Sequence, residues 1–335
     1  MTADTPADMP AGTSARLRWR RAHRAALDHL LRLVAESSLA GQLVLRGSMV
    51  MPAWVGAGAR EPGDLDWIVP RPLIVPIDPL DPYPYVDDVA VVQQWPETAD
   101  GAGAGAYEMW KQEEYDTRGV RAVRPPEGLR WITGPEPEPE TAPPHRELLD
   151  LVRQRPVAAP GVVLDPDAAR DDGTWTYSAY DTPGVRVTVP WRAEGLPPGE
   201  ARMDFARDER LPQAPVCTAV PRGDGGPPAV VRTASRELSL AWKLLWLHTD
   251  ASTEAGAQGK DLYDAVLLAE TRGIRLSPRL LRTVFPPGVA APTGAVVRSW
   301  SVDWESFRAG HPAVRGTAEE WLDRLCRALT SVTAP

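Results

Sequence analysis

Residues 43–69 read LVLRGSMVMPAWVGAGAREPGDLDWIV, and the rest of the chain is organised around this stretch. Its pattern predicts a strand over Leu43–Arg46, a tight turn at Gly47–Ser48 and a short apolar helix. A glycine- and proline-rich loop then leads into a second strand that carries Asp64 and Asp66. The stretch therefore predicts a strand–turn–helix–loop–strand unit with polar side chains at the turn and on the second strand.

Asp64 and Asp66 are separated by one residue. Because side chains alternate along a strand, both carboxylates should project from one face, while Leu65 and Trp67 face a core. Two carboxylates on one face repel each other unless a cation lies between them, and Mg²⁺ prefers oxygen ligands of this kind. The D-x-D pattern is also common by chance, so by itself it does not identify a site.

Gly47 and Ser48 end the first strand and open the short helix. Backbone N–H groups in such a turn can hold a phosphate, although a Gly-Ser pair after a strand is commonly only a turn. A phosphate-binding turn beside a metal-binding pair of carboxylates indicates phosphoryl or nucleotidyl transfer.

Composition sets limits on the class of protein. The chain has 335 residues, 43% hydrophobic and 24% charged, as expected for a soluble globular protein of one large or two ordinary domains. A net charge of −8 argues against a broadly basic nucleic-acid binder. Cys217 and Cys326 lack metal-ligand spacing. No apolar run reaches the roughly 18 residues that span a bilayer, and the N-terminus is unlike a signal peptide. A cytoplasmic location without a membrane partner is expected.

Three parts of the chain differ in composition. Residues 1–13 are expected to be a disordered tail, residues 14–230 an α/β domain interrupted by a proline-rich insertion at about 70–145, and residues 231–335 a helical domain. Strands are predicted over Val162–Leu164, Trp175–Ala179, Val185–Trp191 and Ala201–Phe205. Helices are predicted over Ser14–Ser37, Arg146–Gln154, Ser277–Val284, Val296–Phe307 and Thr317–Leu329. The expected fold class is α+β, a mixed sheet with flanking helices plus a C-terminal helical bundle.

Asp204 interrupts one of these strands, in the sequence ARMDFA. Ala201, Met203 and Phe205 should share one face, and Arg202 and Asp204 the other. An aspartate in mid-strand is unfavourable without a reason. It either faces solvent on an edge strand or serves a site.

Lys243 lies in an unusually apolar helix that Ser235 can cap. Between Leu238 and Leu247 the other polar residue is Ser239. A lysine in such a helix must either snorkel to water or meet a partner, since its burial without one is costly. Farther along, Asp261 and Asp264 should share one face of a helix.

Two groups of residues resemble a known family. The order strand, G-S, short helix, loop and D-L-D-W resembles the opening motif of the nucleotidyltransferase fold, in particular the AbiEii/AbiGii-type nucleotidyltransferases. That family includes toxins of bacterial toxin–antitoxin systems. Its A-x-K helix and R-D-x-x-D element are similar to Ala241–Lys243 and Lys260–Asp264, with Lys260 where the family usually has an arginine. No match is found to the family's lysine-containing motif between the D-x-D strand and the third aspartate.

The resemblance implies a Mg²⁺-dependent enzyme, with two ions, that moves an NMP group from an NTP to an acceptor hydroxyl. It implies that the metal is held by Asp64, Asp66 and Asp204. It implies a nucleotide site formed by Gly47, Ser48, Lys243, Asp261 and Asp264, with Lys243 also counted as catalytic. A degenerate family member that binds nucleotide or a partner without transfer is the non-enzyme alternative.

The acceptor and the protein partners are less defined by these motifs. Candidate acceptors are tRNA, as for several toxins of the resembled family, a small hydroxylated molecule, or a protein. The resemblance also implies an antitoxin partner. The one dense basic cluster is either a solvated helix face or a contact for an anionic partner. It comprises Arg16, Arg18, Arg20, Arg21 and Arg24.

Overall fold

In a computed structural model, the chain divides into two compact units, Met1–Pro70 with Pro144–Pro335, and Arg71–Pro143. The structure describes residues 13–70, 85–86, 114–117, 120–123, 129–130, 143–173, 176–177, 182–207, 209, 211–286, 289 and 292–332. Apart from Thr13, the expected N-terminal tail lies outside these residues. The domain boundaries expected from composition stay a prediction.

The second unit is described only as two pairs of short antiparallel strands. Strand β3 (Tyr85–Val86) pairs with β6 (Leu129–Arg130), and β4 (Glu114–Thr117) pairs with β5 (Val120–Val123). The following account concerns the first unit.

The first unit is built on a large mixed sheet with strand order β13-β14-β1-β2-β12-β11-β8-β7. Strands β9 and β10 also pair with β11. Its strands are β1 (Val44–Arg46), β2 (Asp64–Val69), β7 (Val157–Ala159), β8 (Val162–Leu164), β9 (Arg170–Asp172), β10 (Thr176–Tyr177), β11 (Thr182–Ala193), β12 (Gly199–Arg207), β13 (Val216–Val220) and β14 (Ala229–Thr233). Strand β2 is antiparallel to β1 and parallel to β12. With helices on both faces, this arrangement confirms the α+β class.

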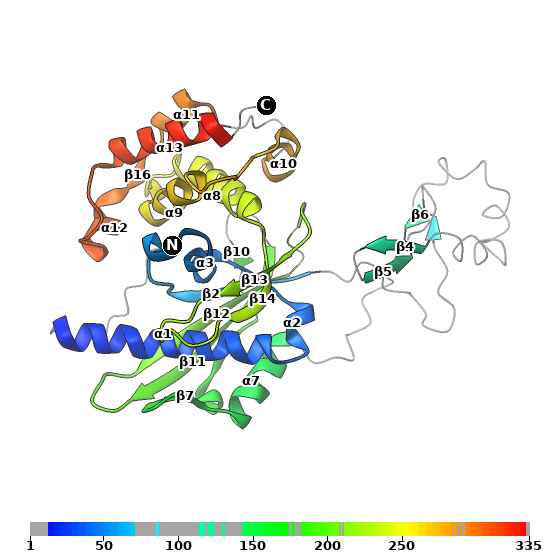
Figure 1. The fold of residues 1–335 in the computed structure, drawn as a ribbon, viewed down its shortest axis with the longest axis vertical. Helices are drawn as coiled ribbons and strands as arrows, with labels where there is room; N and C mark the ends of the chain where they lie inside the picture. Colours follow the sequence, from blue (N-terminus) through cyan, green and yellow to red (C-terminus); the bar gives the residue numbers. More distant parts are fainter. Residues whose placement is uncertain are drawn as a thin grey trace. The chain divides into compact units, whose positions relative to one another are not determined.

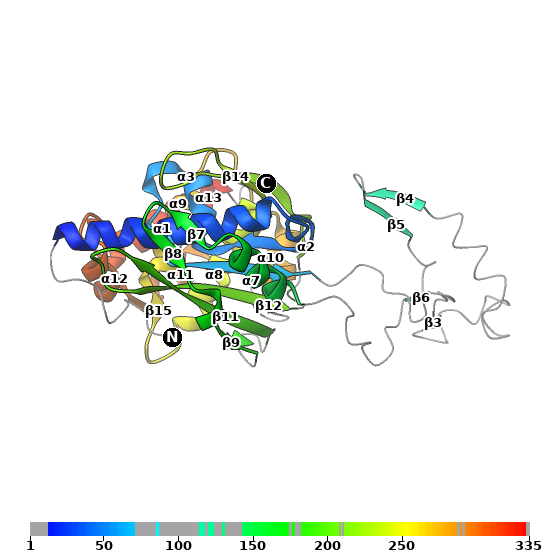
Figure 2. The same cartoon turned by 90° about the horizontal axis from the view of Figure 1, so that it is seen from below.

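One face of the sheet is covered by α1 (Thr13–Ala35) and α7 (Pro144–Gln154) (Figure 1, Figure 2). The apolar stripe of α1 is buried here because its leucines recur at helical spacing. Leu65 and Trp67 of β2, and Met203 and Phe205 of β12, belong to this core. The alternation predicted for both strands is confirmed.

A second core includes Val44 and Ile68 from the opposite face of β1 and β2. Its helices are α3 (Met51–Val55), α8 (Arg236–Asp250), α9 (Gly259–Ala269), α10 (Pro278–Val284), α11 (Gly294–Arg298), α12 (Trp304–Gly310) and α13 (Ala318–Val332). In Figure 1 the C-terminal helices, coloured yellow to red, gather beyond α3. Asp64 and Asp66 alternate with Leu65 and Trp67, so they lie on the face of β2 that these helices approach. The short helix α2 (Leu39–Gln42) belongs to the first core through its buried Leu39.

The single helix predicted over Val296–Phe307 is wrong. The chain leaves α11 after Arg298 and forms β16 (Val302–Asp303), which pairs with β15 (Ala257–Gln258). The Asp303 side chain then accepts a hydrogen bond from the Ser306 N–H and caps α12. The helical spacing of the apolar residues continues across this break, so the sequence pattern does not reveal where the helix ends. None of the helices in the described part of the chain is long and apolar enough to cross a membrane.

Candidate active site

Three carboxylates meet on adjacent strands of the sheet. The parallel pairing of β2 with β12 places Asp204 beside Asp66 and Arg202 beside Asp64. One oxygen from each of Asp64, Asp66 and Asp204 lies within 4.8 Å of the other two. An all-oxygen, anionic donor set of this kind fits a hard divalent ion such as Mg²⁺.

Two arginines accompany these carboxylates. Arg202 Nη2 lies 2.5 Å from an oxygen of Asp64, and Arg186 on β11 donates two hydrogen bonds to Asp204, of 2.8 and 2.9 Å. Burial pushes the pKa of Asp64 up, but the charge and hydrogen bond of Arg202, followed by the charges of Lys260 and Arg60, hold that pKa below its ordinary value. Asp64 is therefore a carboxylate at neutral pH, as a metal ligand must be.

The Gly47–Ser48 turn touches the same carboxylates. It forms a 3₁₀ turn, η1 (Gly47–Met49), at the end of β1. Gly47 has a φ of +76°, and a Cβ atom there would lie 2.1 Å from an Asp66 carboxylate oxygen. Ser48 Oγ lies 3.5 Å from an Asp64 oxygen. Glycine is required because the backbone is left-handed and approaches Asp66 too closely for a side chain.

Gly47→Ala is expected to weaken binding of Mn²⁺, used as a probe of the carboxylates, by at least about tenfold, because the new methyl group displaces Asp66. Calorimetric titration of the apo protein with Mn²⁺ measures this. Gly161→Ala is the matched control, since Gly161 has a φ of +77° and nothing within 4 Å of the Cβ position. Both substitutions should cost about 1 kcal/mol or more of stability. Equal Mn²⁺ affinity in the two variants would contradict the contact.

Lys243 does not snorkel to water. It is 6% exposed, and its Nζ lies 2.6 Å from Asp261 Oδ1 and 3.3 Å from Asp264 Oδ2. Burial acts to lower the pKa of Lys243, but Asp261 and Asp264 together hold it above its ordinary value. Lys243 is thus a buried ammonium that neighbouring carboxylates keep charged.

Arg60 is the residue of this cluster that sequence analysis missed. It lies in the loop after η2 (Gly56–Gly58), and its guanidinium holds both oxygens of Asp264, at 3.1 to 3.2 Å. Lys260, in the first turn of α9, stands where the resembled family has an arginine. The bidentate contact comes instead from Arg60. Arg60 lies in a glycine-rich loop four residues before Asp64, where no helix or strand periodicity indicates which way a side chain points.

The carboxylate cluster and the Lys243 cluster adjoin. Burial acts to lower the pKa of Arg60, but it is raised overall, by Asp264 first and then by Asp64 and Asp261. A cation-binding set of oxygens thus lies beside a group of buried and half-buried cations. Such an arrangement suits a metal-bound polyphosphate.

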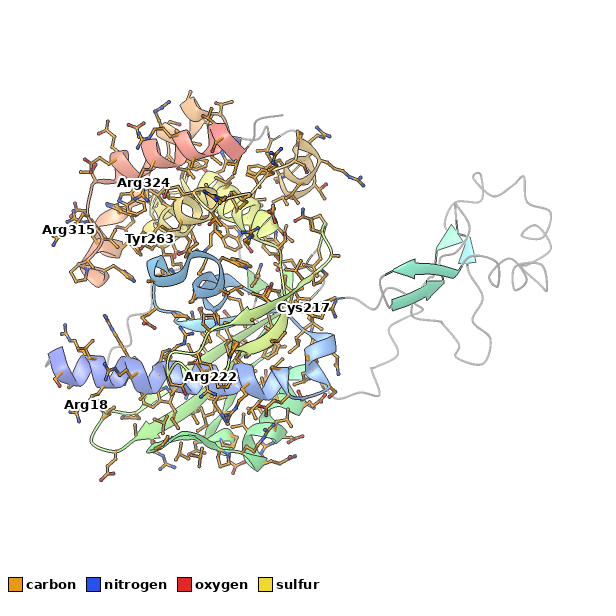
Figure 3. The ribbon with its side chains drawn as sticks, in the orientation of Figure 1. Arg18, Cys217, Arg222, Tyr263, Arg315 and Arg324 are labelled. Atoms are coloured by element: carbon orange, nitrogen blue, oxygen red, sulfur yellow. The ribbon has the colours of Figure 1, made fainter. Side chains whose placement is uncertain are left out.

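The basic cluster of α1 is smaller than expected. Arg24 donates to Asp28 at 2.9 Å and to the Pro221 carbonyl at 2.8 Å, and 11% of its side chain is exposed. It therefore fastens α1 to the loop after β13 and is not part of an exposed patch. The exposed members are Arg16, Arg18, Arg20 and Arg21. Figure 3 labels Arg18 near the N-terminal end of α1.

A comparison with protein families gives a match. A family model described as "Nucleotidyl transferase AbiEii toxin, Type IV TA system" matches residues 139–324, more than half of the chain. The chain belongs to this AbiEii family. The matched residues contain Asp204, Lys243, Asp261 and Asp264, whereas Gly47–Asp66 precede them. The pairing of β2 with β12 and the contact of Arg60 with Asp264 bring the preceding part against the matched part. A comparison with curated proteins found no match.

Proposed function

We propose that this AbiEii-family chain transfers an NMP group from an NTP to an acceptor hydroxyl, with divalent ions held by Asp64, Asp66 and Asp204. The observation that carries the proposal is the convergence of three carboxylate oxygens within 4.8 Å, one of them on Asp64, whose charge acts on Arg60 of the Lys243 cluster. When bound, Mg²⁺ would supply charge neutralisation at the α-phosphate. The acceptor oxygen bonds to the α-phosphorus as the bond to pyrophosphate breaks, and the hydroxyl proton passes to solvent.

The chain's own residues have separate tasks in this proposal. The backbone of Gly47 and Ser48 holds the triphosphate, and the Ser48 hydroxyl faces Asp64. Lys243 meets phosphate oxygens with a donor that Asp261 and Asp264 do not use, because an ammonium has three N–H groups. Asp261 and Asp264 position that ammonium. An intact set of three carboxylates favours an active enzyme over a degenerate nucleotide binder.

The decisive assay uses each NTP labelled in turn at the α- and γ-phosphate, with Mg²⁺ and either total tRNA or a cell extract. Label from the α-position should reach an acceptor, and label from the γ-position should leave as pyrophosphate. Asp204→Asn is the control for contaminating enzymes. Transfer of γ-label would indicate a kinase, and absence of label from every acceptor fraction would contradict the proposal.

The acceptor is proposed to be tRNA, which an acidic protein must hold by a local positive surface. Replacing Arg18, Arg20 and Arg21 together by Gln should weaken tRNA binding and lower the slope of log affinity against log salt by about 2 to 3. NTP affinity should not change. Replacing Arg272, Arg275 and Arg279, which are exposed on the C-terminal part, is the charge-matched control. Unchanged tRNA binding in the Arg18, Arg20 and Arg21 variant would mean that the RNA is held elsewhere, and equal loss in both triple variants would mean that affinity follows net charge and not this surface.

Labelling of a small hydroxylated molecule or a protein in place of tRNA would identify the other class of acceptor. The family's description names a toxin–antitoxin system, so an antitoxin partner is part of the proposal. Co-purification with the product of a neighbouring gene would test it. The cytoplasmic location stays a prediction.

A further inference from the structure

Arg60 joins two parts of the candidate site that are far apart in the sequence. It precedes Asp64 by four residues, and its partner Asp264 lies 204 residues away on α9. Asp264 is fully buried, whereas 13% of the Arg60 side chain is exposed. The Nε of Arg60 lies 3.2 Å from both Asp264 oxygens, and Nη2 lies 3.1 Å from Oδ2. This is a fork contact that fixes the plane of the carboxylate.

A second contact holds the same loop to the same helix. The Tyr263 hydroxyl donates to the carbonyl of Gly58, two residues before Arg60, at 2.8 Å; Tyr263 is labelled in Figure 3. Tyr263 and Asp264 are consecutive residues of α9. The loop that leads into the D-x-D strand is therefore attached to α9 at two points. Its attachment sets where β2 begins relative to the helix that carries Asp261 and Asp264.

Asp264 is shared between Arg60 and Lys243. The Lys243 ammonium lies closer to Asp261, at 2.6 Å, than to Asp264, at 3.3 Å. Because Arg60 already satisfies both oxygens of Asp264, Lys243 is not drawn fully toward that carboxylate. Without the guanidinium, Asp264 would be a fully buried anion whose one remaining ion-pair partner among the described residues is Lys243. The flexible lysine stem would then turn to it.

We propose that Arg60 is a positioning residue for nucleotide binding: by holding Asp264 it keeps the Lys243 ammonium beside Asp261 with a donor left for the triphosphate. The inference rests on the proposed function, because it needs Lys243 to meet phosphate. Lysine cannot replace arginine here, since a single ammonium does not reproduce a planar fork.

The test is calorimetric titration of the full chain with a non-hydrolysable Mg²⁺–NTP, for wild type, Arg60→Lys and Arg60→Met. Both variants should bind the nucleotide at least about tenfold more weakly. Arg60→Lys, which keeps the positive charge near Asp64, should bind Mn²⁺ alone like wild type. Arg324→Lys is the control for the loss of a fork contact as such, since Arg324 makes one of 2.7 and 2.9 Å with Glu270 at the C-terminal end of α9. It should bind nucleotide like wild type.

A second measurement separates positioning from mere support of the fold. If Arg60 acts through Lys243, Arg60→Lys should change nucleotide affinity by less than about twofold in a Lys243→Met background. Folded Arg60 variants with wild-type nucleotide affinity, even with a lowered melting temperature, would overturn the positioning role alone. A wild-type chain that binds no NTP would overturn the proposed function and this inference together.

Discussion

Asp66→Asn is expected to abolish nucleotidyl transfer, with a loss of about a thousandfold or more. The substitution removes one negative charge and almost no volume from the cluster of three carboxylates. Charge stabilisation by a bound metal is worth several kcal/mol, and about 4 kcal/mol corresponds to a thousandfold in rate. Single-turnover transfer from α-labelled NTP measures it. Mn²⁺ affinity, measured by calorimetry, should fall in parallel.

Asp64→Asn should abolish transfer as well, but the structure changes what is expected of its stability. It breaks the 2.5 Å ion pair with Arg202, which is only about one-quarter exposed, so the fold should be less stable. Asp323→Asn is a control, because Asp323 pairs with Arg298 on the surface of the C-terminal helices. Near wild-type turnover by either Asp64→Asn or Asp66→Asn in Mg²⁺ would show that the carboxylates are not the catalytic centre.

Lys243→Met is expected to lower both nucleotide affinity and stability. For a lysine that snorkels to water, a methionine that keeps the stem and deletes the charge would change stability little or even raise it. The ion pairs reverse that expectation, because Asp261 would remain buried without the partner that holds its pKa below the ordinary value against the effect of burial. Removing one member of a buried pair costs about 3 to 5 kcal/mol. Thermal unfolding and NTP titration give the two quantities separately.

The double variant Lys243→Met with Asp261→Asn separates the two effects of the substitution. It removes both charges of the closest pair, so much of the lost stability should return. Nucleotide affinity should stay low, because the ammonium is still missing. A double variant that recovers both stability and nucleotide affinity would show that Lys243 only supports the fold.

Local patterns predicted the features that depend on neighbours in the chain. The period of two in β2 and β12 correctly assigned Leu65, Trp67, Met203 and Phe205 to the core. Ser235 caps α8 as expected, accepting a hydrogen bond from the Leu238 N–H. These patterns succeed because strand alternation and helix capping depend on a few consecutive residues.

Family resemblance extended the prediction to residues far apart in the chain. It grouped Asp204 with the D-x-D pair and Lys243 with Asp261 and Asp264, and the distances bring each group together. Whether these groups act on nucleotide stays a prediction. Neither periodicity nor composition could have supplied the groupings, because both describe only local stretches of chain.

Tertiary structure alone decided which charges meet. Sheet register places Arg202 beside Asp64 across 138 residues, and the loop before β2 brings Arg60 to Asp264 across 204. Arg24 looked like a surface cation and is instead bound to Asp28. The sequence by itself determined the faces of strands and helices, since these follow from fixed backbone geometry. The ion pairs follow from strand order and helix packing. These depend on interactions summed over the whole core, so no short stretch of sequence predicts them.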